Sequence, residues 1–91
     1  MTKRTRLEII RDILQVIRAK DGKIKPTHIL YKSNLSHQLM ELYLKELIEK
    51  EFIKEIKLGK DRTYSLTDKG RNYLEKYKII VEFTASFGLF E

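Results

Sequence analysis

The sequence lacks cysteine altogether, and its two histidines, His28 and His37, stand apart from each other. Without cysteine, the chain forms neither disulfides nor thiolate metal sites. It also has no His-x-x-x-His spacing and no glycine-rich phosphate loop. Its carboxylates are scattered among lysines, as Glu46 and Lys50 are, which is typical of helix-surface pairs. We therefore expect a protein that is not an enzyme and that has no metal site, cofactor or small-molecule ligand.

Long apolar runs are missing as well. A membrane-spanning helix needs ~20 apolar residues, whereas the longest apolar region, residues 79–90, is shorter and contains Glu82. Near the start, Glu8, Arg11 and Asp12 interrupt the apolar residues, so we expect no signal peptide. We expect a cytoplasmic protein with no membrane partner. Its many Lys, Glu and Ile residues are typical of a thermophilic source.

Positive charge exceeds negative charge, with 19 Lys and Arg residues against 13 Asp and Glu residues. The net charge of +6 and the isoelectric point near 9.6 favour a polyanionic partner. A chain of 91 residues allows one domain, residues 1–91, whose core is small enough to gain stability from association.

The first helix is predicted over residues 5–20. Thr5 and Glu8 fit a capping box at its start, and Asp21-Gly22 would end it, because glycine readily adopts positive φ. Its apolar residues form two adjacent stripes, made of Leu7, Ile10, Leu14 and Ile17 and of Ile9, Ile13 and Val16. So wide an apolar face indicates more than one packing neighbour.

Residues 23–25 are predicted to form a strand with a single bridge. A second helix follows, beginning either with Pro26 as its first residue or with Thr27 as its N-cap, and ending near Lys32. Asn34 is the residue of the next turn best suited to the left-handed conformation.

A third helix and a hairpin are predicted next. Ser36 suits an N-cap, and the helix would end near Glu51. Its inward stripe would hold Leu39, Tyr43, Leu47 and Ile48, and its outer face Met40, Glu41 and Leu42. Residues 52–58 and 63–66 read as strands around a turn at residues 59–62. The order of elements predicts an α+β fold, a winged helix-turn-helix with three helices and a β-hairpin wing over residues 7–66.

A fourth helix is predicted over residues 67–87, with Thr67 as its cap. Gly70 lies in its first turn, where a side chain would collide with the hairpin. Apolar residues then recur along one stripe, which contains Tyr73, Tyr77, Ile80, Val81, Phe83 and Phe87. One winged-helix body does not cover so long a stripe.

Several short motifs carry a family resemblance. They are Asn-Leu-Ser at 34–36, Tyr43-Leu44, Leu47-Ile48, Phe52-Ile53, Tyr64-x-Leu-Thr and Lys69-Gly70. Over roughly residues 5–82, this 10.9 kDa chain resembles the archaeal winged-helix DNA-binding proteins of about ten kilodaltons. The resemblance implies a small basic protein, chromatin-associated or regulator-like, that dimerises through its C-terminal helix.

A DNA-binding function of this kind assigns roles to particular residues. Helix 36–50 would enter the major groove, where Gln38 pairs with adenine and Glu41 accepts from cytosine, and residues 57–62 would lie on the backbone. The basic N-terminal residues would contact phosphate or fray. The candidate DNA-binding residues are Lys3, Arg4, Arg6, Thr27, Lys32, Ser36, His37, Gln38, Glu41, Lys45, Lys57, Lys60 and Arg62. Such a protein would be nucleoid-associated, as a regulator or as an architectural protein.

Two alternatives remain open at the level of the sequence. The apolar stripe of the fourth helix predicts a homodimer, but the same helix would be covered in a monomer if it folded back on Ile9, Ile13 and Val16. Separately, the apolar residues on the outer face of the third helix suit a winged helix that binds another protein and no DNA. The target sequence and any effector are not specified by these patterns.

Overall fold

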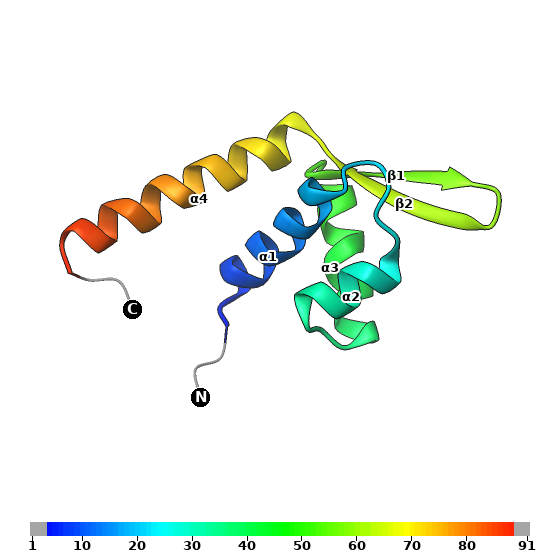
Figure 1. Ribbon diagram of the computed structural model, residues 1–91, viewed down its shortest axis with the longest axis horizontal. Helices are drawn as coiled ribbons and strands as arrows, with labels where there is room; N and C mark the ends of the chain where they lie inside the picture. The colour runs from blue at the N-terminus through cyan, green and yellow to red at the C-terminus, as the bar shows by residue number, and fades with distance from the viewer. Residues whose placement is uncertain (1–3, 89–91) are drawn as a thin grey trace.

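The computed structural model describes residues 4–88, which fold into four helices and one antiparallel hairpin (Figure 1). The elements are α1 (Arg6–Ala19), α2 (Pro26–Ser33), α3 (His37–Glu49), β1 (Ile53–Leu58), β2 (Asp61–Leu66) and α4 (Asp68–Ser86). The predicted fold class and order of elements are confirmed. None of the helices described is both long enough and apolar enough to traverse a bilayer.

Helix α1 begins at the predicted capping box. The Thr5 N–H donates to Glu8 Oε1 over 2.8 Å, and the Glu8 N–H donates to Thr5 Oγ1 over 3.1 Å. The hydrogen bond from the Thr5 backbone lowers the pKa of the Glu8 carboxyl. After the helix, Gly22 takes a φ of +80°, as expected of a terminating glycine. The buried face of α1 consists of Ile10, Ile13, Leu14 and Ile17, whereas Leu7 is exposed.

Helices α2 and α3 form the helix-turn-helix. Pro26 is the first residue of α2, so Thr27 is not its N-cap, and the choice left open by the sequence is settled for proline. Asn34 ends α2 in the left-handed region with a φ of 53°. Ser36 then caps α3, accepting the Leu39 N–H over 3.2 Å. Local side-chain chemistry therefore sets both ends of the turn.

The hairpin has a tighter turn than predicted. Leu58 pairs with Asp61, so the turn holds only Gly59 and Lys60, and the expected four-residue turn is wrong. Gly59 has a φ of +63°, the left-handed region that two-residue hairpin loops require. Arg62 consequently lies within β2, directly opposite Lys57.

The core lies where α1, α2, α3 and the base of the hairpin meet. Its buried members include Ile13, Leu14, Ile29, Leu44, Leu47, Ile53, Tyr64 and Leu66. Ile24 bridges Tyr64, which confirms the predicted single-bridge strand. Met40 is only 1% exposed, so its predicted place on the outer face of α3 is wrong, while Leu39 lies 38% exposed on the flank of that helix. Of the other predicted inward residues, Tyr43 and Leu47 are buried and Ile48 packs against the core. The error therefore concerns only the adjacent pair Leu39 and Met40.

The first turn of α4 fits closely against the start of the hairpin. Thr67 caps the helix by accepting the Gly70 N–H over 3.1 Å. A Cβ added at Gly70 would overlap the carbonyl oxygen of Phe52 and lie 3.3 Å from Leu66 Cδ2. The predicted reason for a glycine at this position is confirmed.

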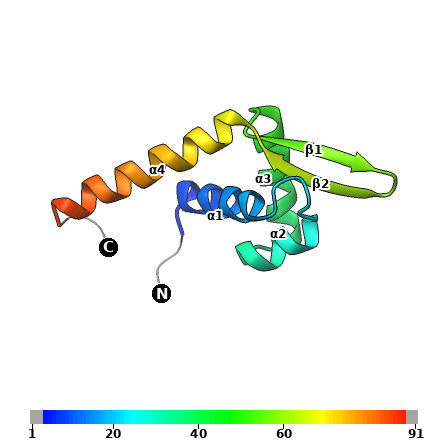
Figure 2. The same cartoon turned by 45° about the horizontal axis from the view of Figure 1, so that its top comes forward.

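Helix α4 packs on α1 with its first half only. The Tyr73 hydroxyl donates to the carbonyl of Leu7 over 3.0 Å, and the Arg11 guanidinium lies 5.1 Å from the Tyr77 ring centroid. Beyond these contacts α4 extends away from the body, on the side opposite to the hairpin (Figure 2). In the single chain, α4 is therefore covered by α1 along its first half and exposed along the rest.

Candidate nucleic-acid interface

The outward side of α3 carries one ridge of exposed side chains. It consists of Gln38, Leu42, Lys45 and Glu49, spaced three or four residues apart, so the four lie along one line of the helix. The opposite side holds buried Met40, Tyr43, Leu44 and Leu47. His37 is exposed at the start of the helix. The ridge is what α3 offers to a partner, and an α-helix is an element that the major groove of DNA admits.

A groove of about 730 Å³ separates α3 from the hairpin. Glu41 and Lys45 line it from the helix, and Glu55, Arg62 and Tyr64 line it from the strands. Lys57 lies opposite Arg62 in the register and therefore points to the same face of the hairpin. The wing and α3 thus border one continuous hollow, with basic side chains on both sides.

Arg62 turns inward instead of pointing freely from the wing. Its Nη2 donates to Glu41 Oε1 over 3.1 Å, and its Nη1 lies 3.6 Å from Glu55 Oε2. The hydrogen bond to Glu41 raises the pKa of Arg62. A carboxylate near DNA phosphates is repelled by them, and this arginine compensates the charge of Glu41. Glu55 also lies 3.8 Å from Lys57 Nζ, so Asp61 of the turn is not the only carboxylate beside the wing cations.

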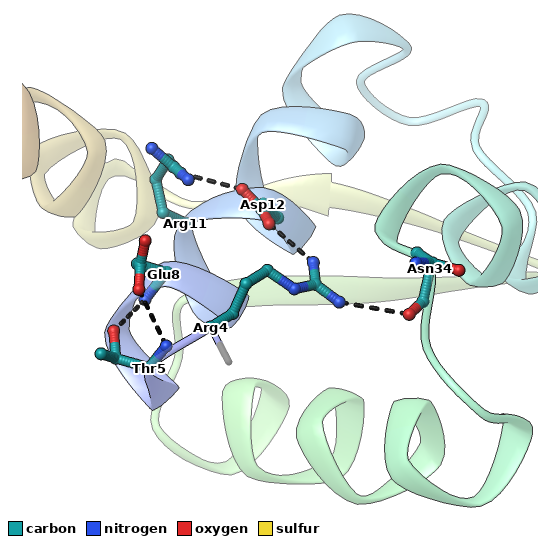
Figure 3. Close-up of polar contacts among 6 residues, drawn as sticks. All are labelled: Arg4, Thr5, Glu8, Arg11, Asp12 and Asn34. Atoms are coloured by element: carbon teal, nitrogen blue, oxygen red, sulfur yellow. Dashed lines mark hydrogen bonds and ion pairs between the residues drawn. The ribbon is translucent and has the colours of Figure 1, made fainter. Parts of the chain in front are cut away.

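Two of the basic N-terminal candidates, Arg4 and Arg6 at the start of α1, are held against the body. Arg4 Nη1 donates to Asp12 Oδ2 over 2.7 Å, and its Nη2 donates to the carbonyl of Asn34 over 3.2 Å, so it joins α1 to the turn of the helix-turn-helix (Figure 3). Arg6 pairs with Glu46 of α3 and lies 5.5 Å from the Tyr43 ring centroid. The hydrogen bond from Arg6 lowers the pKa of the Glu46 carboxyl. Both side chains position α3, and each has a carboxylate partner.

The other candidate residues differ in whether they are ion-paired, exposed or used as a helix cap. Among residues 4–88, Lys32, Lys45 and Lys60 form no ion pair with another described residue. Thr27 is exposed on the first turn of α2, and Ser36 serves as a helix cap. Lys3, the remaining basic N-terminal candidate, lies outside the described residues.

The residues predicted for a dimer interface fall into two groups on α4. Tyr73, Tyr77 and Val81 are half-buried, and the two tyrosines contact α1 or the start of the hairpin. Ile80, Phe83 and Phe87 are exposed on the extended half, together with Ile79, which sequence reasoning missed. These four side chains are 62–64% exposed. Ile79 neighbours Ile80 and belongs to the same apolar run, which was the available signal.

Glu55 and Leu42 were underrated by sequence reasoning. Glu55 anchors Arg62 and accepts a hydrogen bond from the Tyr64 hydroxyl over 3.3 Å. The register gives a signal for this contact, because Glu55 and Tyr64 are directly opposite once the turn is placed correctly. Leu42 was noted only as an apolar residue of the outer face, yet it occupies the middle of the exposed ridge.

Comparisons with known proteins agree with this architecture. Residues 3–85 match the family model described as winged helix-turn-helix. The structure is similar to that of Sso10a-2, a DNA-binding protein from Sulfolobus solfataricus, with a TM-score of 0.79 and 19% identity over 92% of this chain and 85% of that one. It is also similar to a variant of S. aureus MepR bound to an oligodeoxyribonucleotide, with a TM-score of 0.75 and 14% identity over 87% of this chain and 60% of that one.

A relative in sequence comes from the archaeon Methanocaldococcus jannaschii. The uncharacterized protein MJ0290 is 36% identical over 74 residues, which make up 81% of this chain and 32% of that protein. The chain therefore spans about a third of the length of this relative. The resemblance to archaeal winged-helix proteins stated from sequence motifs is confirmed by these matches.

Proposed function

The chain belongs to the winged helix-turn-helix family, and on this basis we propose that it binds double-stranded DNA. Helix α3 would enter the major groove, and the hairpin would lie on the phosphate backbone, as in related docking geometries. The observation that carries the proposal is the ridge of α3 beside a wing whose outer lysines have no strong carboxylate partner. Sso10a-2 is described as DNA-binding and MepR as bound to an oligodeoxyribonucleotide, which supports the same class of partner.

The candidate residues would fall into three groups, which contact phosphate, contact bases, or hold α3 and the wing in position. Lys45, Lys57 and Lys60 have charges available for phosphate, and Lys32 and Thr27 lie on α2, the helix that crosses the backbone in this motif. Gln38 and His37 are on the exposed start of α3 and would reach base edges. Arg4, Arg6 and Arg62 would contribute chiefly by holding α3 and the wing in place, with Ser36 fixing the start of the helix.

Fluorescence anisotropy of a labelled duplex, titrated with the full chain at several salt concentrations, tests the proposal. Each phosphate contact contributes about 0.9 to the slope of log affinity against log salt. With about six contacts per dimer, three lysines from each protomer, we expect affinity to fall roughly 10³-fold between 50 and 200 mM salt. Absence of binding at low salt would refute the proposal. Equal affinity for duplexes of different sequence would identify an architectural protein, acting on the nucleoid as a packer of DNA.

We also propose a homodimer through α4. Ile79, Ile80, Phe83 and Phe87 form an exposed apolar patch on the half of the helix that extends beyond the body. Patches of this kind mark interaction sites, and two copies related by a two-fold axis would cover them in one self-complementary interface. The pairing would present two α3 helices to half-sites one helical turn, or a multiple of it, apart.

One observation favours a second candidate function, a protein-interaction module without DNA binding. Leu42 and Leu39 are exposed on α3, and apolar side chains are typical of helix faces that dock on proteins. The anisotropy titration separates the two functions, because a protein-interaction module would not bind duplex DNA in a salt-dependent manner.

A further inference from the structure

Leu42 is an apolar side chain at the centre of the ridge that α3 presents. It is 62% exposed, with Gln38 four residues before it and Lys45 three residues after it. The core does not need it, because Met40, Tyr43, Leu44 and Leu47 already fill the buried side of the helix. Leaving a leucine in water forgoes the stability its burial would give. A partner that covers Leu42 would recover that contribution.

Its surroundings indicate what kind of group that partner offers. Gln38 has an amide that donates and accepts, and Lys45 carries a cation without an ion-pair partner among residues 4–88. The nearest carboxylate on this part of the helix, Glu41, is turned toward the wing by its 3.1 Å contact with Arg62. Leu42 therefore projects between a polar and a cationic side chain, and the carboxylate of the ridge, Glu49, lies one turn beyond Lys45.

We propose that Leu42 reads the 5-methyl group of thymine in the major groove. This inference rests on the proposed DNA-binding function and adds the base that the ridge recognises. Among the base edges of the major groove, the thymine methyl is an apolar group, and apolar side chains contact it there. Gln38 and Leu42 are about 6 Å apart along the helix axis, at 1.5 Å per residue. That spacing corresponds to roughly two base-pair steps of 3.4 Å, so an adenine for Gln38 and a thymine for Leu42 would lie within one short A·T-containing stretch.

The size of the effect follows from the area of one methyl group. Burying one such group is worth about 0.8 kcal/mol, which is roughly a fourfold change in affinity. Two protomers that each bury one methyl would give about sixteenfold. Because deoxyuridine differs from thymidine only by this methyl, the contact is testable without knowing the natural target sequence.

The experiment compares two duplexes of alternating sequence, several helical turns long. One contains dA and dT, and the other contains dA and deoxyuridine. Alternating sequence presents a methyl group in every register, so the position of the protein on the duplex does not matter. Affinities are measured by anisotropy for the wild-type chain, for Leu42→Ala and for Leu39→Ala. Leu39 is the matched control, since it is a leucine of the same helix that lies roughly 60° around the helix from Leu42, in a hollow that both leucines line with Arg6 and Tyr43. Thermal unfolding of each variant confirms that it is folded.

We expect the wild type to prefer the thymine duplex by about fourfold to sixteenfold. Leu42→Ala should abolish this preference by weakening binding to the thymine duplex only, and Leu39→Ala should retain it. Equal wild-type affinity for both duplexes would overturn the inference while leaving DNA binding intact. A preference that persists in Leu42→Ala, or that disappears equally in Leu39→Ala, would also overturn it. Failure of the wild type to bind either duplex would instead refute the proposed function, and the inference with it.

Discussion

Single basic residues of the hairpin have different roles although their side chains are alike. Lys57 and Arg62 face each other across the two strands, yet Arg62 is held by Glu41 and Glu55. Lys57 has only a 3.8 Å contact with Glu55 and is exposed, so that contact is weak. The available charge of the wing therefore lies at Lys57 and Lys60, and Arg62 fixes the distance between wing and α3.

Replacing Lys57 by glutamine should weaken DNA binding nearly uniformly across sequences, because phosphate contacts position the protein and carry no base information. The salt slope should fall by about 0.9 for each lost contact, hence by about two for a dimer. Lys54→Gln is the matched control, since alternation of the strand points Lys54 to the opposite face. Equal changes in the salt slope for both variants would show that the face of the hairpin carrying Lys57 does not contact the DNA backbone preferentially.

Tyr64 should lower the free energy of unfolding as the pH rises above about 10. Burial raises its pKa to about 12, and its side chain is 1% exposed. The unfolded chain ionises near pH 10, so between pH 10 and 12 the unfolded state binds fewer protons than the folded one, and stability falls as pH rises. A shift of this size is worth about 2 to 3 kcal/mol. Urea unfolding at pH 8 and pH 11 should show a smaller alkaline loss for Tyr64→Phe than for the wild type. Identical losses would mean that Tyr64 ionises equally easily in both states.

For single residues, the sequence predicts the features that depend on neighbouring positions in the chain. Thr5, Ser36, Thr67, Gly22 and Asn34 were all placed correctly, because a cap or a left-handed residue depends on neighbours within a few positions. The pairing of Arg62 with Glu41, or of Arg4 with Asn34, depends on residues that meet only after folding. No spacing rule along the chain specifies such contacts.

Among the elements, α4 has the most constrained beginning. Its first turn packs so tightly that the carbonyl of Phe52 occupies the place of a side chain at position 70. Gly→Ala inside a helix ordinarily stabilises by about 1 kcal/mol. At position 70, overpacking against the Phe52 carbonyl should make the same substitution destabilising.

We expect Gly70→Ala to destabilise the protein by about 1 to 3 kcal/mol, measured by chemical denaturation. Asn72→Ala, at an exposed site two residues further along the same helix, is the control and should be neutral or slightly stabilising. A stabilising effect of Gly70→Ala would show that α4 can move away from the hairpin without cost.

Element boundaries were predictable where one residue dominates and not where two compete. Proline and threonine both suit the start of α2, and only the packed structure selects Pro26. In the hairpin, Gly59, Lys60 and Asp61 all read as turn residues, and pairing across the strands decides that Asp61 belongs to β2. Register is a property of two segments, so one segment's composition does not fix it.

The whole molecule is elongated, with principal extents of 50 × 30 × 21 Å. The hairpin and α4 account for its length, since they leave the body on opposite sides (Figure 1). The sequence predicted the stripe on α4 but not its division into a half that packs on α1 and a half that extends. That division depends on the length of α1 and on the packing of Gly70 against the carbonyl of Phe52, which are not encoded in the stripe itself.

Ile80→Glu should convert a dimer into monomers, because the charge would be buried without a partner in the interface. Sedimentation equilibrium at micromolar concentration should give the wild type twice the 10.9 kDa mass of one chain. Ala85→Glu adds the same charge to an exposed site five residues further, roughly 140° around the helix, and should leave the dimer intact. A wild-type mass of one chain would contradict the proposed interface.

The most direct test of DNA recognition by α3 and the wing is an NMR titration of the full chain with duplex DNA, following backbone amide shifts residue by residue. Helix α3 from His37 to Lys45 and the hairpin from Lys57 to Arg62 should show the largest changes, because they would meet the major groove and the backbone. The extended half of α4, residues 79–87, should show little change. Shifts concentrated on α4, or binding that leaves α3 unperturbed, would contradict the proposed mode of recognition.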